Sequence, residues 1–263
     1  MKLYSILNTK TARYAKLLLY FDNALAIATC FLWFVYPIYL RLKGQHFEVT
    51  IWLPYDENKE LFFYITAIYS WITTTWLAFS NTTMDVMIST LLAQSKTQLT
   101  ILSFKIPETF NSLFERRFKD IIMHHKEIVK YVLEYHFSIK NSYQFLIGGW
   151  IICTSVYRLI EVASVECFSM VTYIACILCE MFIFCYYGSE VTHESIKLID
   201  ATYAMKWTEL SVKCRRKIII FMERIKRPLS VMGGLIIPLS NETYVSIVKS
   251  SYSFYALLKS TSE

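Results

Sequence analysis

The sequence predicts an all-α fold: a polytopic helical membrane protein with about five spans and long cytoplasmic helix extensions that form an anchor bundle. Of its 263 residues, 55% are hydrophobic and only 18% are charged, whereas soluble domains devote about a quarter of their residues to charge. The apolar stretches also run for about 20 residues between charged segments, which is the length of a helix that crosses a bilayer. We therefore expect one membrane domain over residues 1–263, without a soluble catalytic module.

The first span is expected at residues 17–40, and its flanking charges orient the chain. The residues before it include four basic side chains and no acidic ones, while residues 41–60 hold four acidic side chains against three basic ones. Because cytoplasmic loops carry an excess of Lys and Arg, the N-terminus is predicted to be cytoplasmic and this loop extracellular. With five spans in a multi-pass arrangement, the C-terminus is then extracellular.

The second span, 61–84, belongs to a helical pattern that continues to about residue 103. A helix of that length measures roughly 60 Å at 1.5 Å per residue, about twice the thickness of the hydrocarbon core. Its far half, 85–103, must project into the cytoplasm as an anchor helix. We expect it to bury one apolar side, formed by Met87, Leu91, Leu92, Leu99 and Leu102.

The remaining elements alternate in the same way between spans and anchor segments. An anchor helix at 114–140 leads into the third span at 144–160. The fourth span is expected at 168–187, and the anchor segment at 189–232 follows it with nine basic residues against five acidic ones. That excess is the strongest cytoplasmic signal in the chain. The fifth span is expected at 239–259.

The stretch before and within the fifth span has two distinctive features. Gly233, Gly234 and Pro238 break any single helix drawn through it, because proline lacks the donor that a helix interior needs. After the break, hydroxyl side chains recur at steps of three and four and therefore share one helical face: Thr243, Ser246, Ser250 and Ser253. Lipid offers a hydroxyl no partner, so this face is either a polar seam inside a helix bundle or the lining of a water-filled pore.

The search for chemistry favours neither an enzyme nor a metal or cofactor site. His124 and His125 lie on a helix without an HExxH or paired-carboxylate pattern, so we interpret them as part of a solvated face. Cys176 and Cys179 form a CxxC in the middle of a span, where packing is the expected role. The net charge of +6 comes from basic residues beside the spans, which indicates topology and not nucleic acid.

Glu180 is an acidic residue inside a span, and such residues face the bundle interior or an ion or ligand path. Both interpretations stay open. Aromatic residues are dense in the outer halves of the spans, where they form either an interfacial belt or the wall of a pocket for small apolar molecules.

Several stretches, taken together and in order, resemble the insect odorant receptor family. They are LPYDENKELFFY at 53–64, the Ser80–Leu102 run with Asn81, Asp85 and Gln98, His124-His125-Lys126, FCYYG at 184–188, and the closing SNETYVSIVKSSYSFYALLKS at 240–260. The related gustatory receptors have a QF after the Thr-Tyr that occurs here as Thr243-Tyr244, and this chain lacks it.

The resemblance implies a receptor subunit for small volatile hydrophobic odorants in the plasma membrane of olfactory sensory neurons. It implies a ligand-gated, non-selective cation channel, a hetero-tetramer with the odorant co-receptor whose subunits meet mostly at the cytoplasmic anchor. The five spans would match the family's third to seventh helices. The alternative is a truncated, non-signalling membrane subunit that assembles with the co-receptor without responding to odorants.

The resemblance also assigns residues to roles. The implied ligand-binding residues are Trp33, Tyr36, Tyr64, Ile68, Trp71 and Tyr173. The implied pore-lining residues are Ser246, Ser250, Ser253 and Leu257. Leu257 is placed at the narrow apolar constriction, and a ring of apolar side chains there would gate by dewetting.

Overall fold

The computed structural model describes residues 2–44, 60–109, 114–136, 140–158, 164–233 and 237–262. Its elements, in chain order, are α1 (Lys2–Leu42), α2 (Glu60–Lys105), the 3₁₀ turn η1 (Pro107–Thr109), α3 (Phe114–His136), α4 (Lys140–Arg158), α5 (Ser164–Tyr203), the 3₁₀ turn η2 (Trp207–Glu209), α6 (Val212–Ile225), β1 (Met232–Gly233), β2 (Ile237–Pro238) and α7 (Asn241–Ser262). Helices dominate these ranges, which confirms the predicted all-α class.

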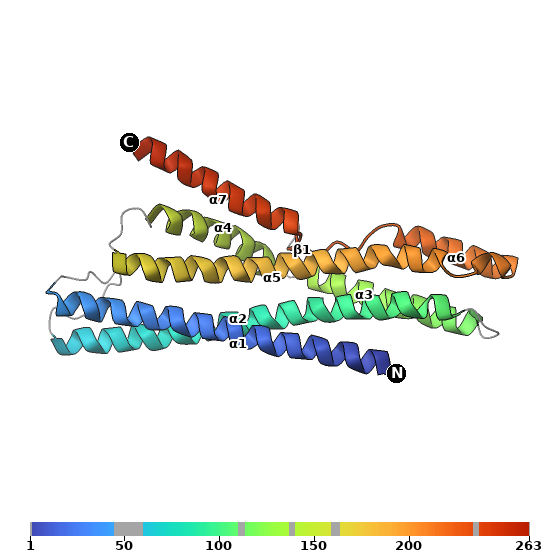
Figure 1. Cartoon of the computed structure of the whole chain (residues 1–263), viewed down its shortest axis with the longest axis horizontal. Coiled ribbons are helices and arrows are strands. Elements are labelled where there is room, and N and C mark those ends of the chain that lie inside the picture. Colours follow the sequence, from blue (N-terminus) through green and yellow to red (C-terminus); the bar gives the residue numbers. More distant parts are fainter. Residues whose placement is uncertain are drawn as a thin grey trace.

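The molecule is elongated, and α1, α2 and α5 lie along its long axis (Figure 1). Both α1 and α5 pack against α2. One half of the molecule contains α3, α6 and the parts of α2 and α5 beside them. It is called the anchor half below. At the other half, α4 and α7 lie beside the first part of α5 (Figure 1).

Three helices in the described part of the chain are long and apolar enough to cross a membrane: α1 over Thr9–Leu42, α2 over Leu61–Lys105 and α5 over Cys167–Tyr203. At 1.5 Å per residue, the 46 residues of α2 extend about 69 Å, which is more than twice the roughly 30 Å of a bilayer's hydrocarbon core. That a large part of this helix projects beyond the bilayer stays a prediction. Within the described residues, the shorter α4 and α7 are not among the helices that meet this criterion of length and composition. Their assignment as the third and fifth spans stays a prediction.

The buried core lies mainly in the anchor half. Leu99 and Leu102 of α2 are fully buried, as are Ile106, directly after α2, and Leu198 of α5. By contrast, large apolar side chains of the candidate spans are exposed, with Trp76 at 76%. Surfaces that meet lipid keep apolar groups outside, whereas helices outside the bilayer must bury them against each other. Met87 differs from the predicted apolar side, because it is 52% exposed.

Two anchor segments differ from the predicted ones. The segment expected over 114–140 is described as α3 to His136 and as α4 from Lys140, and the residues between them lie outside the described ranges. The segment 189–232 is not one helix: α5 runs through to Tyr203, and α6 covers only Val212–Ile225. Pro228 explains the second helix end, because the residue before a proline is disfavoured in helical conformation.

The break predicted before the last helix is a two-stranded hairpin. β1 and β2 pair antiparallel, with Met232 opposite Pro238 and Gly233 opposite Ile237. The amide of Leu239 extends the pairing by donating to the Val231 carbonyl at 2.8 Å. Gly233 and Pro238 therefore interrupt the helix as predicted; Gly234 lies outside the described residues.

Candidate functional site

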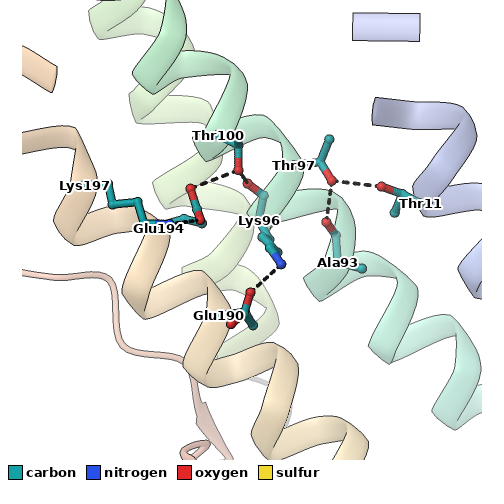
Figure 2. Close-up of polar contacts among 8 residues, drawn as sticks. All are labelled: Thr11, Ala93, Lys96, Thr97, Thr100, Glu190, Glu194 and Lys197. Atoms are coloured by element: carbon teal, nitrogen blue, oxygen red, sulfur yellow. Dashed lines mark hydrogen bonds and ion pairs between the residues drawn. The ribbon is translucent and has the colours of Figure 1, made fainter. Parts of the chain in front are cut away.

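A group of polar contacts, called the polar crossing below, joins α2 to α5 in the anchor half (Figure 2). Lys96 of α2 forms an ion pair with Glu190 of α5. One turn further along each helix, Thr100 lies 3.0 Å from Glu194, whose other carboxylate oxygen accepts from Lys197 at 2.7 Å. Burial works to lower the pKa of Lys96, but the hydrogen bond and charge of Glu190 outweigh it and raise that pKa. Glu194 is only 7% exposed, so these partners replace the water it has lost.

A second contact attaches α1 to the same region of α2 (Figure 2). The Thr97 hydroxyl donates to the Ala93 carbonyl at 2.9 Å. The Thr11 and Thr97 hydroxyls form a hydrogen bond, with their oxygens 3.0 Å apart. The N-terminal part of α1, at Thr11, therefore lies beside the part of α2 that contains Thr97.

The predicted ligand-binding residues are only partly brought together. Trp33 of α1 meets Tyr173 of α5 edge-on, with ring centroids 6.2 Å apart. Trp71 of α2 instead contacts Phe34, with ring centroids 5.2 Å apart. Successive helical residues point about 100° apart, so Trp33 and Phe34 face different neighbouring helices. Tyr36 is half-buried. Phe34 was missed, although it lies in the same aromatic run as Trp33.

Tyr64, Ile68 and Trp71 share one face of α2 with Thr75, since the spacings are four, three and four residues. Tyr64 and Ile68 are 42% and 48% exposed. The Thr75 hydroxyl is buried and has no hydrogen-bond partner among the residues that the structure describes. A buried hydroxyl without a partner costs about 1–3 kcal/mol, which makes Thr75 a candidate to bind a polar group of a ligand. Its spacing from the aromatic residues could have identified it from sequence.

The last helix has two different faces. Toward the bundle, Tyr244 meets Phe182 of α5 edge-on at 5.5 Å. Ile247 packs toward Gly149 of α4, where an added Cβ would lie 3.8 Å from its Cγ2. Ser251, 5% exposed, donates to the Ile247 carbonyl at 2.9 Å. This inward face combines apolar packing with one satisfied hydroxyl.

The other face of α7 borders an open hollow of about 1010 Å³. All four predicted pore-lining residues, Ser246, Ser250, Ser253 and Leu257, border it together with Asn241, Glu242, Val245, Lys249 and Phe254. The three serines therefore do not form a polar seam within this chain. Thr243 lies apart from them, because its amide donates to the Ser240 hydroxyl oxygen and its own hydroxyl donates to the Pro238 carbonyl. The pore-lining role stays a prediction.

The expected solvated face of His124 and His125 is wrong for His125, which is 7% exposed and meets the Phe221 ring edge-on at 5.5 Å. It falls on the buried stripe of α3, formed by Phe114, Phe118, Ile121, Ile128 and Val132. Burial, followed by the charge of Arg224, lowers the pKa of His125 to about 4. His124 is half-buried and donates to Gln98 at 3.2 Å. Within the described ranges, no group of three His, Cys, Asp or Glu side chains is arranged to hold a metal.

Comparison with known proteins gives a consistent result. The family model described as 7tm Odorant receptor matches residues 2–252. Odorant receptor 94a of Drosophila melanogaster is 25% identical over 234 residues, which cover 85% of this chain and 60% of that relative. Odorant receptor 46a, isoform A, of the same species is 28% identical and is also covered to 60%. The chain thus spans about 60% of the length of these relatives.

Among solved structures, the olfactory receptor OR5 from Machilis hrabei in complex with eugenol is similar, with a TM-score of 0.87 at 20% identity. The match covers 99% of this chain and 70% of that receptor. A second structure of the same receptor gives a TM-score of 0.86. These likenesses show a shared fold.

Proposed function

This chain belongs to the 7tm odorant receptor family, and from that premise we propose that it is a subunit of an odorant-gated, non-selective cation channel. The channel resides in the plasma membrane of olfactory sensory neurons. Its ligands are small volatile hydrophobic molecules, and its partner is the odorant co-receptor in a hetero-tetramer. The curated relatives are named odorant receptors, which supports the assignment of the sensory role.

The observation that carries the channel proposal is the division of α7 into two faces. Its inward face packs on α4 and α5, while Ser246, Ser250 and Ser253 remain exposed on the open hollow. Serines exposed to lipid would lack partners, so a water-filled axis shared with other subunits is the environment that suits them. Leu257, 62% exposed on the same hollow, supplies the apolar constriction that gates the pore by dewetting.

The odorant contacts the aromatic layer formed by α1, α2 and α5. Trp33, Tyr36, Tyr64, Ile68, Trp71 and Tyr173 provide apolar and aromatic surface there, and such side chains give a ligand large contact area at low entropic cost. Thr75 adds a hydroxyl on the same face of α2. One polar group among apolar walls is the usual way in which a pocket orients a small ligand.

The N-terminus is cytoplasmic and the C-terminus extracellular in this proposal. The contact between Thr11 and Thr97 supports that orientation, because it places the start of α1 beside the part of α2 that projects from the membrane. The basic residues near the N-terminus support it as well. In this orientation, α7 begins at the hairpin on the cytoplasmic side and runs toward the extracellular C-terminus.

The proposal is tested by co-expression with the odorant co-receptor and recording of odorant-evoked current. Ser250→Cys and Ser253→Cys place thiols on the hollow, and Val248→Cys places a thiol on an exposed part of α7 outside it. A positively charged, water-soluble thiol reagent is expected to reduce current through the first two variants and not through Val248→Cys. Wild-type protein treated with the reagent controls for its seven native cysteines.

Two outcomes would contradict parts of this proposal. Equal modification of all three variants would refute the pore-lining role of the serines. Absence of current from the wild type across a broad odorant panel, with surface expression verified, would refute the channel role. Co-purification with the co-receptor in that silent case would instead favour a subunit that assembles without responding.

A further inference from the structure

The connector between α6 and α7, which the structure describes at residues 226–233 and 237–240, contacts α5 through its own backbone. The Leu229 amide donates to the Ser195 hydroxyl at 3.0 Å, and the Leu229 carbonyl accepts from the Thr192 hydroxyl at 3.0 Å. At the other end of the connector, the first amide of α7, at Asn241, donates to Ser189 at 3.3 Å. Backbone groups in a non-helical segment need partners when they are withdrawn from water, and α5 provides them here.

At Gly188, Leu239 of the connector approaches the α5 backbone closely. A Cβ at this position would lie 2.4 Å from the Leu239 carbonyl oxygen and 2.6 Å from the Leu239 Cβ. Leu239 cannot easily give way, because it is 2% exposed and its amide is bonded to Val231. Only glycine allows this approach. An alanine would require the connector to move by about 1 Å to restore ordinary contact distances.

The residues involved form one stripe on α5, since Thr192 follows Gly188 by four residues and Ser189 by three, and Ser195 follows Thr192 by three: Gly188, Ser189, Thr192 and Ser195. We infer that this stripe, called the docking track below, holds the first turn of α7 against α5. The first turn, which begins at Asn241, is called the foot of α7. Gly188 is the residue that determines how closely the two segments approach each other. The track fixes the position of the first turn of α7. It therefore also fixes the position of the α7 face that borders the hollow. No break in α5 separates the track from Tyr173, 15 residues earlier in the same helix.

This continuity gives the track a role in gating, and that consequence rests on the proposed channel function. A shift of α5 at the aromatic layer moves the foot of α7 with it, because a helix transmits displacement along its length. The residues between Tyr173 and Gly188 correspond to about 22 Å of helix. The α5 helix also contacts α7 directly, through Phe182 and Tyr244.

The test of docking is hydrogen exchange measured by mass spectrometry on the purified full chain. Gly188→Ala is expected to speed exchange in the 229–241 peptides about three- to tenfold, as the loss of a hydrogen bond does in a locally opening segment. Gly149→Ala is the matched control, because its Cβ would meet α7 at an ordinary 3.8 Å. Peptides from α2 and α3 report whether each variant folds, and their exchange is expected to be unchanged.

A second variant keeps the test decisive if Gly188→Ala does not fold. Thr192→Val removes the donor to the Leu229 carbonyl and keeps the shape of the side chain, so exchange near Leu229 should rise. Equal exchange in Gly188→Ala and Gly149→Ala, or unchanged exchange in Thr192→Val, would overturn the docking track.

Current recording tests the gating consequence separately. Where the wild type conducts, Gly188→Ala is expected to lose odorant-evoked current relative to Gly149→Ala at equal surface expression. Wild-type current in Gly188→Ala, despite faster exchange, would overturn the link between the track and gating. A silent wild type would refute the proposed function and leave the exchange result to decide the docking track on its own.

Discussion

Thr100→Val removes one hydroxyl from the polar crossing of α2 and α5 and keeps the side-chain shape (Figure 2). Glu194 is 7% exposed, so its oxygen that now accepts from Thr100 has little access to water. A hydrogen bond to a charged group contributes about 1.5–3 kcal/mol. The single Thr100 proton is shared, however, because the Lys96 carbonyl also lies 3.0 Å away. We therefore expect a cost at the lower end, about 1–2 kcal/mol.

The loss is measured as a shift in Tm of the detergent-solubilised protein. A thiol-reactive dye reports unfolding, because Cys185 and Cys214 are free and buried. At about 2–4 °C per kcal/mol for a chain of this size, Thr100→Val should lower Tm by about 2–8 °C. Thr90→Val is the matched control on the same helix, where the hydroxyl donates to the Met87 carbonyl. Its cost should stay within about 0.5 kcal/mol.

A double-mutant cycle with Glu194→Gln measures the interaction itself, and we expect a coupling of about 1 kcal/mol. The amide of glutamine can donate to Thr100 and leave the hydroxyl proton to Lys96, so Glu194→Gln alone should cost less than Thr100→Val. Equal Tm values for Thr100→Val and Thr90→Val, together with zero coupling, would refute this account of the crossing.

Three further predictions concern the proposed gate, the ligand layer and the anchor. Leu257→Ala should raise resting current by widening the apolar constriction, whereas Val248→Ala, outside the hollow, should not; equal resting currents would contradict the gate. Thr75→Val removes a buried hydroxyl and should increase the free energy of unfolding by about 1 kcal/mol, which would raise Tm. The same variant should weaken responses only to odorants with a polar group. A lower Tm would contradict this account of Thr75. The pKa of His125 is about 4 in the folded protein, against 6.5 ordinarily, so the folded protein keeps this ring neutral to lower pH. Because the unfolded chain binds the extra proton first, stability should fall as pH drops through this window, by about 2 kcal/mol between about pH 6.5 and 5. His125→Phe should reduce that slope in Tm measurements, and an unchanged slope would contradict the assignment.

Local sequence signals predicted much of the fold. The long helix α2 was expected to run from the second span to about residue 103, and it ends at Lys105. The interruption before α7 followed from Gly233 and Pro238, whose backbone preferences act without tertiary context. The resemblance to insect odorant receptors is likewise confirmed by the family match over residues 2–252.

Side-chain environments were predicted less well. His124 and His125 are neighbours with the same chemistry, yet one donates to Gln98 and the other is buried against Phe221. Their difference follows from the 100° rotation between successive helical residues and from the position of α6. In the aromatic layer, Trp71 contacts Phe34 and not another predicted ligand-binding residue, because the register between α1 and α2 decides which rings meet.

The sequence by itself determined that this chain is helical, that its spans are apolar, that its last helix is broken from the preceding anchor and that it carries a row of serines. Each of these depends on residues a few positions apart. Only the tertiary structure decided that Ser246, Ser250 and Ser253 face away from the bundle, that Thr100 meets Glu194 from 94 residues away, and that Gly188 admits the Leu239 backbone. These outcomes depend on where helices cross, and packing between distant segments sets those crossings.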